Sequence, residues 1–276
     1  MIRAMARTAR TAALLALLPV LLVAASERTA SAAPRYVDRA LTQPRLVFQG
    51  DAGLGIAHLK LGREDFTGVG ANLEGTIGIT DSVELGLRTG LRFGDDARIL
   101  GADAFGRTLF TETYGVATDT LANPEFHVRW AFYSGRVAEV GLDGRVYLPV
   151  ETGSSFGVMF GVPLAFHIAD LMRIDLGVYI PVITSNPTVT VISVPAYFWF
   201  QVSNQVWLGP MVGLRHVNPG NPAPSHDDLL LGFGLGYQVA SSVDLKWWLL
   251  APRVNGNEND PRVYGGGMGV AFRIGE

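Results

Sequence analysis

Hydrophobic and polar residues alternate one for one between Val69 and Phe93. A period of two predicts extended strands with one apolar and one polar face, because successive side chains of a strand point to opposite sides. The polar run Thr80, Asp81, Ser82 interrupts the pattern and favours a tight turn. The sequence therefore predicts a β-hairpin whose strands are long enough to cross a bilayer, which takes roughly 9–11 tilted residues.

The same alternation recurs along the rest of the chain and predicts about twelve antiparallel strands. Besides the hairpin, strands are expected near 46–61, 125–132, 139–148, 156–167, 172–182, 189–202, 206–216, 229–239, 243–249 and 264–274. Tight connections alternate with longer ones, and the longest stretch without strict alternation is 94–123. Loops of that length usually have a role of their own or are mobile.

A soluble β-sandwich also has one apolar and one polar face, so alternation alone does not decide the fold. Here the strands are uniformly long, their number is even, and both ends of the strand region lie on the side of the tight turns. Aromatic residues also lie near strand ends on the apolar face, as in the girdles of membrane barrels. They are Phe93, Phe126, Phe132, Phe156, Phe166, Phe200, Tyr237, Tyr264 and Phe272. Together these features favour an all-β fold, a single transmembrane antiparallel up-and-down barrel.

The N-terminus has the pattern of a secretory signal peptide. Arg3, Arg7 and Arg10 precede an apolar stretch over 11–25, and a small-x-small cleavage pattern follows at 30–32. We therefore expect a signal peptide over 1–32, a periplasmic lead-in over 33–44 and the barrel over 45–276. The chain has no cysteine, which excludes disulfides and thiolate metal sites, and its formal net charge of −3 gives no case for nucleic-acid binding.

With this pattern the chain resembles Gram-negative outer-membrane β-barrel proteins of the porin and transporter type, over residues 46–276. The resemblance implies a location in the bacterial outer membrane, with lipid, lipopolysaccharide and the barrel-assembly machinery as partners. It also implies a terminal aromatic residue that the assembly machinery reads. Here Phe272 takes that place, followed by four further residues.

If the apolar face meets lipid, the polar face lines the lumen. Tight turns then set the register, which predicts Glu74 opposite Arg88 and Glu125 opposite Arg145. The same reasoning predicts His127 opposite Asp143, and Gln238 opposite Asp244. The lumen-lining residues predicted in this way are Glu74, Arg88, Arg92, Glu125, His127, Arg129, Asp143, Arg145, Tyr179 and Trp199. Two interpretations stay open: a charged wall that selects solutes, or internal ion pairs that fill the lumen and fix the register.

Glycines and prolines on the strands bear on the size of this lumen. Inward glycines argue for open space, whereas inward aromatic residues argue for a filled interior or for stacking on sugar-like or aromatic solutes. The glycines are Gly141, Gly161, Gly177, Gly213, Gly234 and Gly267, and the aromatic residues are Tyr179, Tyr197, Trp199, Trp207 and Trp248. Pro163, Pro181, Pro195 and Pro210 each remove a hydrogen-bond donor, so bulges or strand ends are expected there.

Three functions follow from this pattern. The leading hypothesis is passage of small hydrophilic solutes through the lumen, with 94–123 folding into one mouth. The second is a closed barrel that binds a partner or a surface polymer through its outer loops. The third is a hydrolase, which requires His127 or His226 beside a hydroxyl group. No cofactor is expected, and the acidic pairs 95–96 and 227–228 lack the ligand spacing of a defined Ca²⁺ site.

Overall fold

The computed structural model describes residues 34–61, 64–94, 121, 123–150, 155–222, 224–255 and 262–275. The predicted signal peptide and nearly all of the stretch 94–123 lie outside these residues, as does the acidic pair 95–96. Within the described part, no helix is long and apolar enough to cross a membrane.

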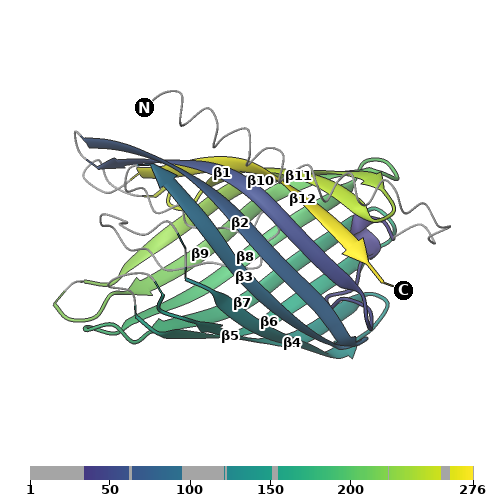
Figure 1. The fold of residues 1–276 in the computed structure, drawn as a ribbon, viewed down its shortest axis with the longest axis horizontal. Helices are drawn as coiled ribbons and strands as arrows, with labels where there is room; N and C mark the ends of the chain where they lie inside the picture. Colours follow the sequence, from purple (N-terminus) through teal and green to yellow (C-terminus); the bar gives the residue numbers. More distant parts are fainter. Residues whose placement is uncertain are drawn as a thin grey trace.

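Twelve antiparallel strands form one closed barrel, in which each strand pairs with its neighbours in the chain and the first pairs with the last (Figure 1). The strands are β1 (Phe48–Leu61), β2 (Glu64–Thr80), β3 (Val83–Gly94), β4 (Glu125–Ser134), β5 (Ala138–Tyr147) and β6 (Gly157–Ile168). They continue with β7 (Met172–Ile183), β8 (Val189–Gln201), β9 (Val206–Asn218), β10 (His226–Ala240), β11 (Val243–Ala251) and β12 (Arg262–Ile274). The predicted fold class and number of strands are confirmed.

The alternation of the sequence becomes the two faces of the barrel wall. Large apolar side chains such as Val128, Phe160 and Met268 are exposed on the outside, whereas Arg129 and Trp199 are buried inside. Closure pairs every edge with another strand, so no strand is left as a free edge.

The two ends of the barrel differ in their connections. The tight turns after β2, β4, β6, β8 and β10 lie at one end, together with the start of β1 and the end of β12, because Phe48 pairs with both Ile77 and Ile274. We call it the short-turn end. A 3-10 turn, η1 (Tyr36–Asp38), precedes the barrel and lies at this end, near the C-terminus in Figure 1.

The predicted register is confirmed for two hairpins and wrong for a third. Glu74 lies opposite Arg88, and Gln238 lies opposite Asp244. In the β4–β5 hairpin, however, His127 lies opposite Arg145 and Arg129 opposite Asp143. The predicted pairs differ by two residues, because β4 extends to Ser134 and the register shifts beside the turn.

The prolines do not produce the bulges that the sequence predicts. Pro163, Pro181, Pro195 and Pro210 all lie within strands, and on one side of each the ladder omits two residue pairs and resumes in the same register. The register shifts instead lie between residues 78 and 80, 131 and 133, and 238 and 240, each beside a tight turn. A missing donor therefore leaves a local gap without changing the pairing.

Candidate functional site in the barrel lumen

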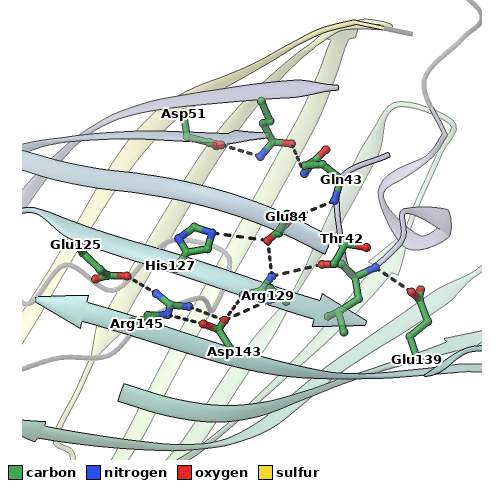
Figure 2. A network of polar contacts seen from close by, with 12 residues as sticks. Thr42, Gln43, Asp51, Glu84, Glu125, His127, Arg129, Glu139, Asp143 and Arg145 are labelled. Atoms are coloured by element: carbon green, nitrogen blue, oxygen red, sulfur yellow. Dashed lines mark hydrogen bonds and ion pairs between the residues drawn. The ribbon is translucent and has the colours of Figure 1, made fainter. Parts of the chain in front are cut away.

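A chain of ion pairs crosses the inner wall from β3 to β5 (Figure 2). The guanidinium of Arg129 lies 3.2 Å from a carboxylate oxygen of Glu84 and 2.6 Å from Asp143. Arg145 in turn donates to Asp143 at 3.1 Å and to Glu125 at 2.5 Å. All five side chains are buried, so acidic and basic groups alternate along a sequence in which each charge has an opposite neighbour. Such short, charge-assisted bonds hold the β3, β4 and β5 wall in one arrangement.

Eight of the ten residues predicted to line the lumen are buried: Arg88, Glu125, His127, Arg129, Asp143, Arg145, Tyr179 and Trp199. Glu74 is half-buried on β2, and the side chain of Arg92 lies outside the described residues. The structure brings Glu125, Arg129, Asp143 and Arg145 into one network, and it adds Glu84, which the sequence reasoning left out. A charged residue on the polar face of the same hairpin was the available signal for Glu84.

Inward glycines accommodate large rings rather than open space. Tyr179 lies against both Gly161 and Gly177, where an added Cβ would come within 2.3 and 2.4 Å of its ring. Trp199 covers Gly234 and Trp248 covers Gly267 in the same way, at 2.6 Å each. The expectation that these glycines leave the lumen open is therefore wrong at Gly161, Gly177 and Gly234, because each of them is buried under a ring. Gly267 stays partly exposed beside Trp248.

Solvent reaches the inner wall mainly on one side. Inward positions of β4 and β5 are almost all buried, whereas those in the middle of β1, β2 and β12 are partly exposed. The partly exposed inward residues in the middle of these three strands are Asp51, Gly53, Gly55, Asn72, Glu74, Gly265, Gly267 and Gly269. They lie side by side, since Gly53 pairs with both Asn72 and Gly269. We call this surface the glycine strip.

The stretch before β1 lies inside the short-turn end of the barrel. Val37 and Leu41 are buried, and Tyr36 stacks on Trp207 with ring centroids 4.8 Å apart. Arg39 forms two hydrogen bonds with Asp244 of β11, at 2.6 and 3.0 Å. The region predicted as a periplasmic lead-in thus includes residues that contact the inner wall, and we call residues 35–45 the N-terminal segment.

Backbone groups at every second residue of the N-terminal segment face polar side chains of the wall. The amides of Leu41, Gln43 and Arg45 donate to Glu139, Glu84 and Asp81 at 3.1, 2.9 and 3.0 Å. The carbonyls of residues 37, 39 and 41 accept from His167, Arg173 and Arg129, respectively. Figure 2 shows the part of this arrangement around Thr42 and Gln43. The sequence offered no signal for these contacts, because they use backbone atoms.

The hydrolase hypothesis requires His127 or His226 to lie beside a hydroxyl group. Among the described residues, neither ring forms a hydrogen bond with a hydroxyl group. Both ring nitrogens of His127 and the Nε2 atom of His226 have no hydrogen-bond partner among the described residues. His127 instead lies 3.7 Å from a carboxylate oxygen of Glu84. The described residues also contain no group of three or more acidic, histidine or cysteine side chains that is placed to hold a metal ion.

No family model and no curated protein sequence matches the chain. Among solved structures, the NanC porin superposes with a TM-score of 0.57, covering 81% of this chain and 100% of that one at 9% identity. An outer membrane channel from Pseudomonas putida F1 gives 0.60, over 84% and 97% of the two chains at 11% identity. The KdgM porin gives 0.51, over 81% and 99% at 8% identity. At these identities the likeness concerns the fold alone, and that fold is the one of outer-membrane porins.

Proposed function

We propose that the protein is an outer-membrane channel for small hydrophilic solutes, narrowed at its short-turn end by the N-terminal segment. The observation that carries the proposal is the glycine strip. In a closed barrel, inward residues that stay partly exposed face water inside the lumen, and the strip runs over neighbouring positions of β12, β1 and β2. Asp51 and Glu74 lie at the end of the strip nearer the short-turn end, and their carboxylates can bind hydrated solutes.

The same structure supports a different role for the β3–β5 wall. Glu125, Arg129, Asp143 and Arg145 are buried and paired with one another, so they act as a support for the wall. The solute path then lies along β12, β1 and β2, beside β3, where most of the partly exposed inward residues are glycines. This choice favours the second of the two interpretations that the sequence left open for these residues.

A second candidate, a closed barrel, is favoured by the N-terminal segment itself. Tyr36, Val37 and Leu41 occupy space inside the short-turn end, and aromatic rings fill positions beside the inward glycines. In that case the function resides in the connections at the opposite end, including 94–123.

Single-channel conductance in a planar lipid bilayer separates the two candidates. The mature chain, residues 33–276, is compared with the variant Tyr36→Ala, Arg39→Ala, which removes the ring stacking and the pair with Asp244. We expect discrete steps from the mature chain and larger steps from the variant. Arg35→Ala is the matched control, because Arg35 contacts only the exposed Asp38 and Asp170 among the described residues. Silence from both folded proteins would contradict the channel.

A further inference from the structure

The wall around the N-terminal segment has the features of a peptide-binding site. The wall forms hydrogen bonds with backbone amides and carbonyls of the segment at alternate positions from 37 to 45. Every peptide has these groups. Besides Asp81 in the β2–β3 turn, the side chains that make them come from six strands, β3 to β8, and not from one neighbouring strand. The β8 contact is the amide of Val37 donating to Gln201 at 3.4 Å. Among the residues that the structure describes, the segment joins the backbone ladder of the sheet only through a bridge between Arg45 and Gly78.

The groups that contact the segment are held in place by the wall. Arg129 is bound to Asp143 at 2.6 Å, and Arg173 is bound to Asp175 at 2.7 Å. Likewise, His167 lies 2.8 Å from Glu139. Each of these side chains therefore keeps a partner of opposite charge or a hydrogen bond without the segment, and a site whose groups are already oriented loses little entropy on binding.

Both ring nitrogens of His167 have hydrogen-bond partners, one in the segment and one in the wall. Its Nδ1 atom faces the carbonyl of Val37 at 2.7 Å, while its Nε2 atom faces the carboxylate of Glu139. Both neighbours are acceptors, so the ring donates from both nitrogens. Glu139 also accepts from the amide of Leu41, which links one carbonyl and one amide of the segment through two adjacent side chains.

Side chains of the segment add two further anchors. Tyr36 stacks on Trp207, and the guanidinium of Arg39 lies over both rings at 5.4 Å from each centroid while it pairs with Asp244. These contacts, unlike those of the backbone, depend on the residue type. Removing them weakens the binding of the N-terminal segment to the wall, and it leaves the wall groups that contact the backbone unchanged.

We propose that the short-turn end of the lumen is a binding site for a short peptide, recognised through its backbone. The chain's own N-terminal segment is the resident ligand, and a peptide supplied in trans replaces it. Binding is direct and needs no conductance, so the inference stands or falls separately from the proposed channel.

The test is a fluorescence-anisotropy titration in detergent micelles with a labelled synthetic peptide of residues 34–45. The protein is the mature chain carrying Tyr36→Ala and Arg39→Ala, with its barrel content checked by circular dichroism. We expect saturable binding to this variant, and much weaker binding to the unsubstituted chain and to Arg35→Ala, whose own segments stay in place. If the double variant does not fold, Arg39→Gln alone serves, since it removes the pair with Asp244.

Two N-methylated peptides test backbone recognition. Methyl groups on the amides of Leu41 and Gln43 remove two donors to carboxylates, which should weaken binding at least about tenfold. Methyl groups on the amides of Ala40 and Thr42 are the matched control, because those amides donate to no other residue that the structure describes. We expect the control peptide to stay within about threefold of the parent. Absence of saturable binding, or equal weakening by the two methylation patterns, would overturn the proposal.

Discussion

Replacing Asp143 with Asn tests whether the ion-pair chain supports the barrel wall. Asp143 accepts four hydrogen bonds, two from Arg129 and two from Arg145. The amide keeps one oxygen but places an N–H₂ group against the guanidinium groups. Breaking a buried ion pair typically costs about 3–5 kcal/mol. Because Arg129 keeps Glu84 and Arg145 keeps Glu125, we expect the lower value, about 3 kcal/mol of unfolding free energy.

Urea unfolding in lipid vesicles, followed by tryptophan fluorescence, measures this loss. The matched control is Asp227→Asn, since Asp227 pairs with His216 at 2.7 Å but its side chain is 79% exposed. An exposed pair contributes little, so the control should change the unfolding free energy by less than about 0.5 kcal/mol. Equal unfolding free energies for the two variants would refute the reasoning that burial makes the ion-pair chain structural.

Two further predictions concern the glycines and the charges of the lumen. Gly236→Ala places a Cβ 2.1 Å from the ring of the fully buried Trp207, so urea unfolding should show a loss of about 1–3 kcal/mol. Gly144→Ala meets nothing within 4 Å and should change stability by less than about 0.5 kcal/mol; a similar loss in both would contradict the packing argument. Asp51→Asn combined with Glu74→Gln, which removes two negative charges from the glycine strip, should shift the reversal potential across a salt gradient toward anion preference. An unchanged potential would remove both residues from the path of permeant ions.

The fold was predictable because period-two alternation specifies both strand and face. The β2–β3 register follows from residues within a single hairpin, whereas the strand number and the barrel follow from alternation, strand length and aromatic positions along the whole chain. Register was predicted wrongly where a shift beside the turn displaced the β4–β5 pairs, as at Ala131 and Tyr133. Such a shift depends on the conformation of one or two residues, which the alternation of the neighbouring strands does not encode.

The arrangement inside the lumen was much less predictable. Alternation indicates that Gly177 and Tyr179 face inward, but it does not show that the ring of Tyr179 covers that glycine. The N-terminal segment has no periodicity, and its contacts use amides and carbonyls that any sequence would offer. Its position depends on groups such as Glu84 and Arg173, which are far apart in the chain and come together only through the closure of the barrel.

The contacts of the N-terminal segment with strands far apart in the chain determine when it can dock during assembly of the barrel. Its last residue, Arg45, forms a bridge with Gly78 on β2. Its Arg39 pairs with Asp244 on β11, which is also bound by Arg273 of β12. β2 and β11 lie on either side of the β1–β12 pair, so a barrel in which β1 and β12 are not yet paired cannot hold both of these contacts at once, although the contacts from β3 to β8 are already available. We therefore expect the segment to dock completely only after β1 has paired with β12. Resistance of its peptide bonds to protease then indicates that the barrel is closed.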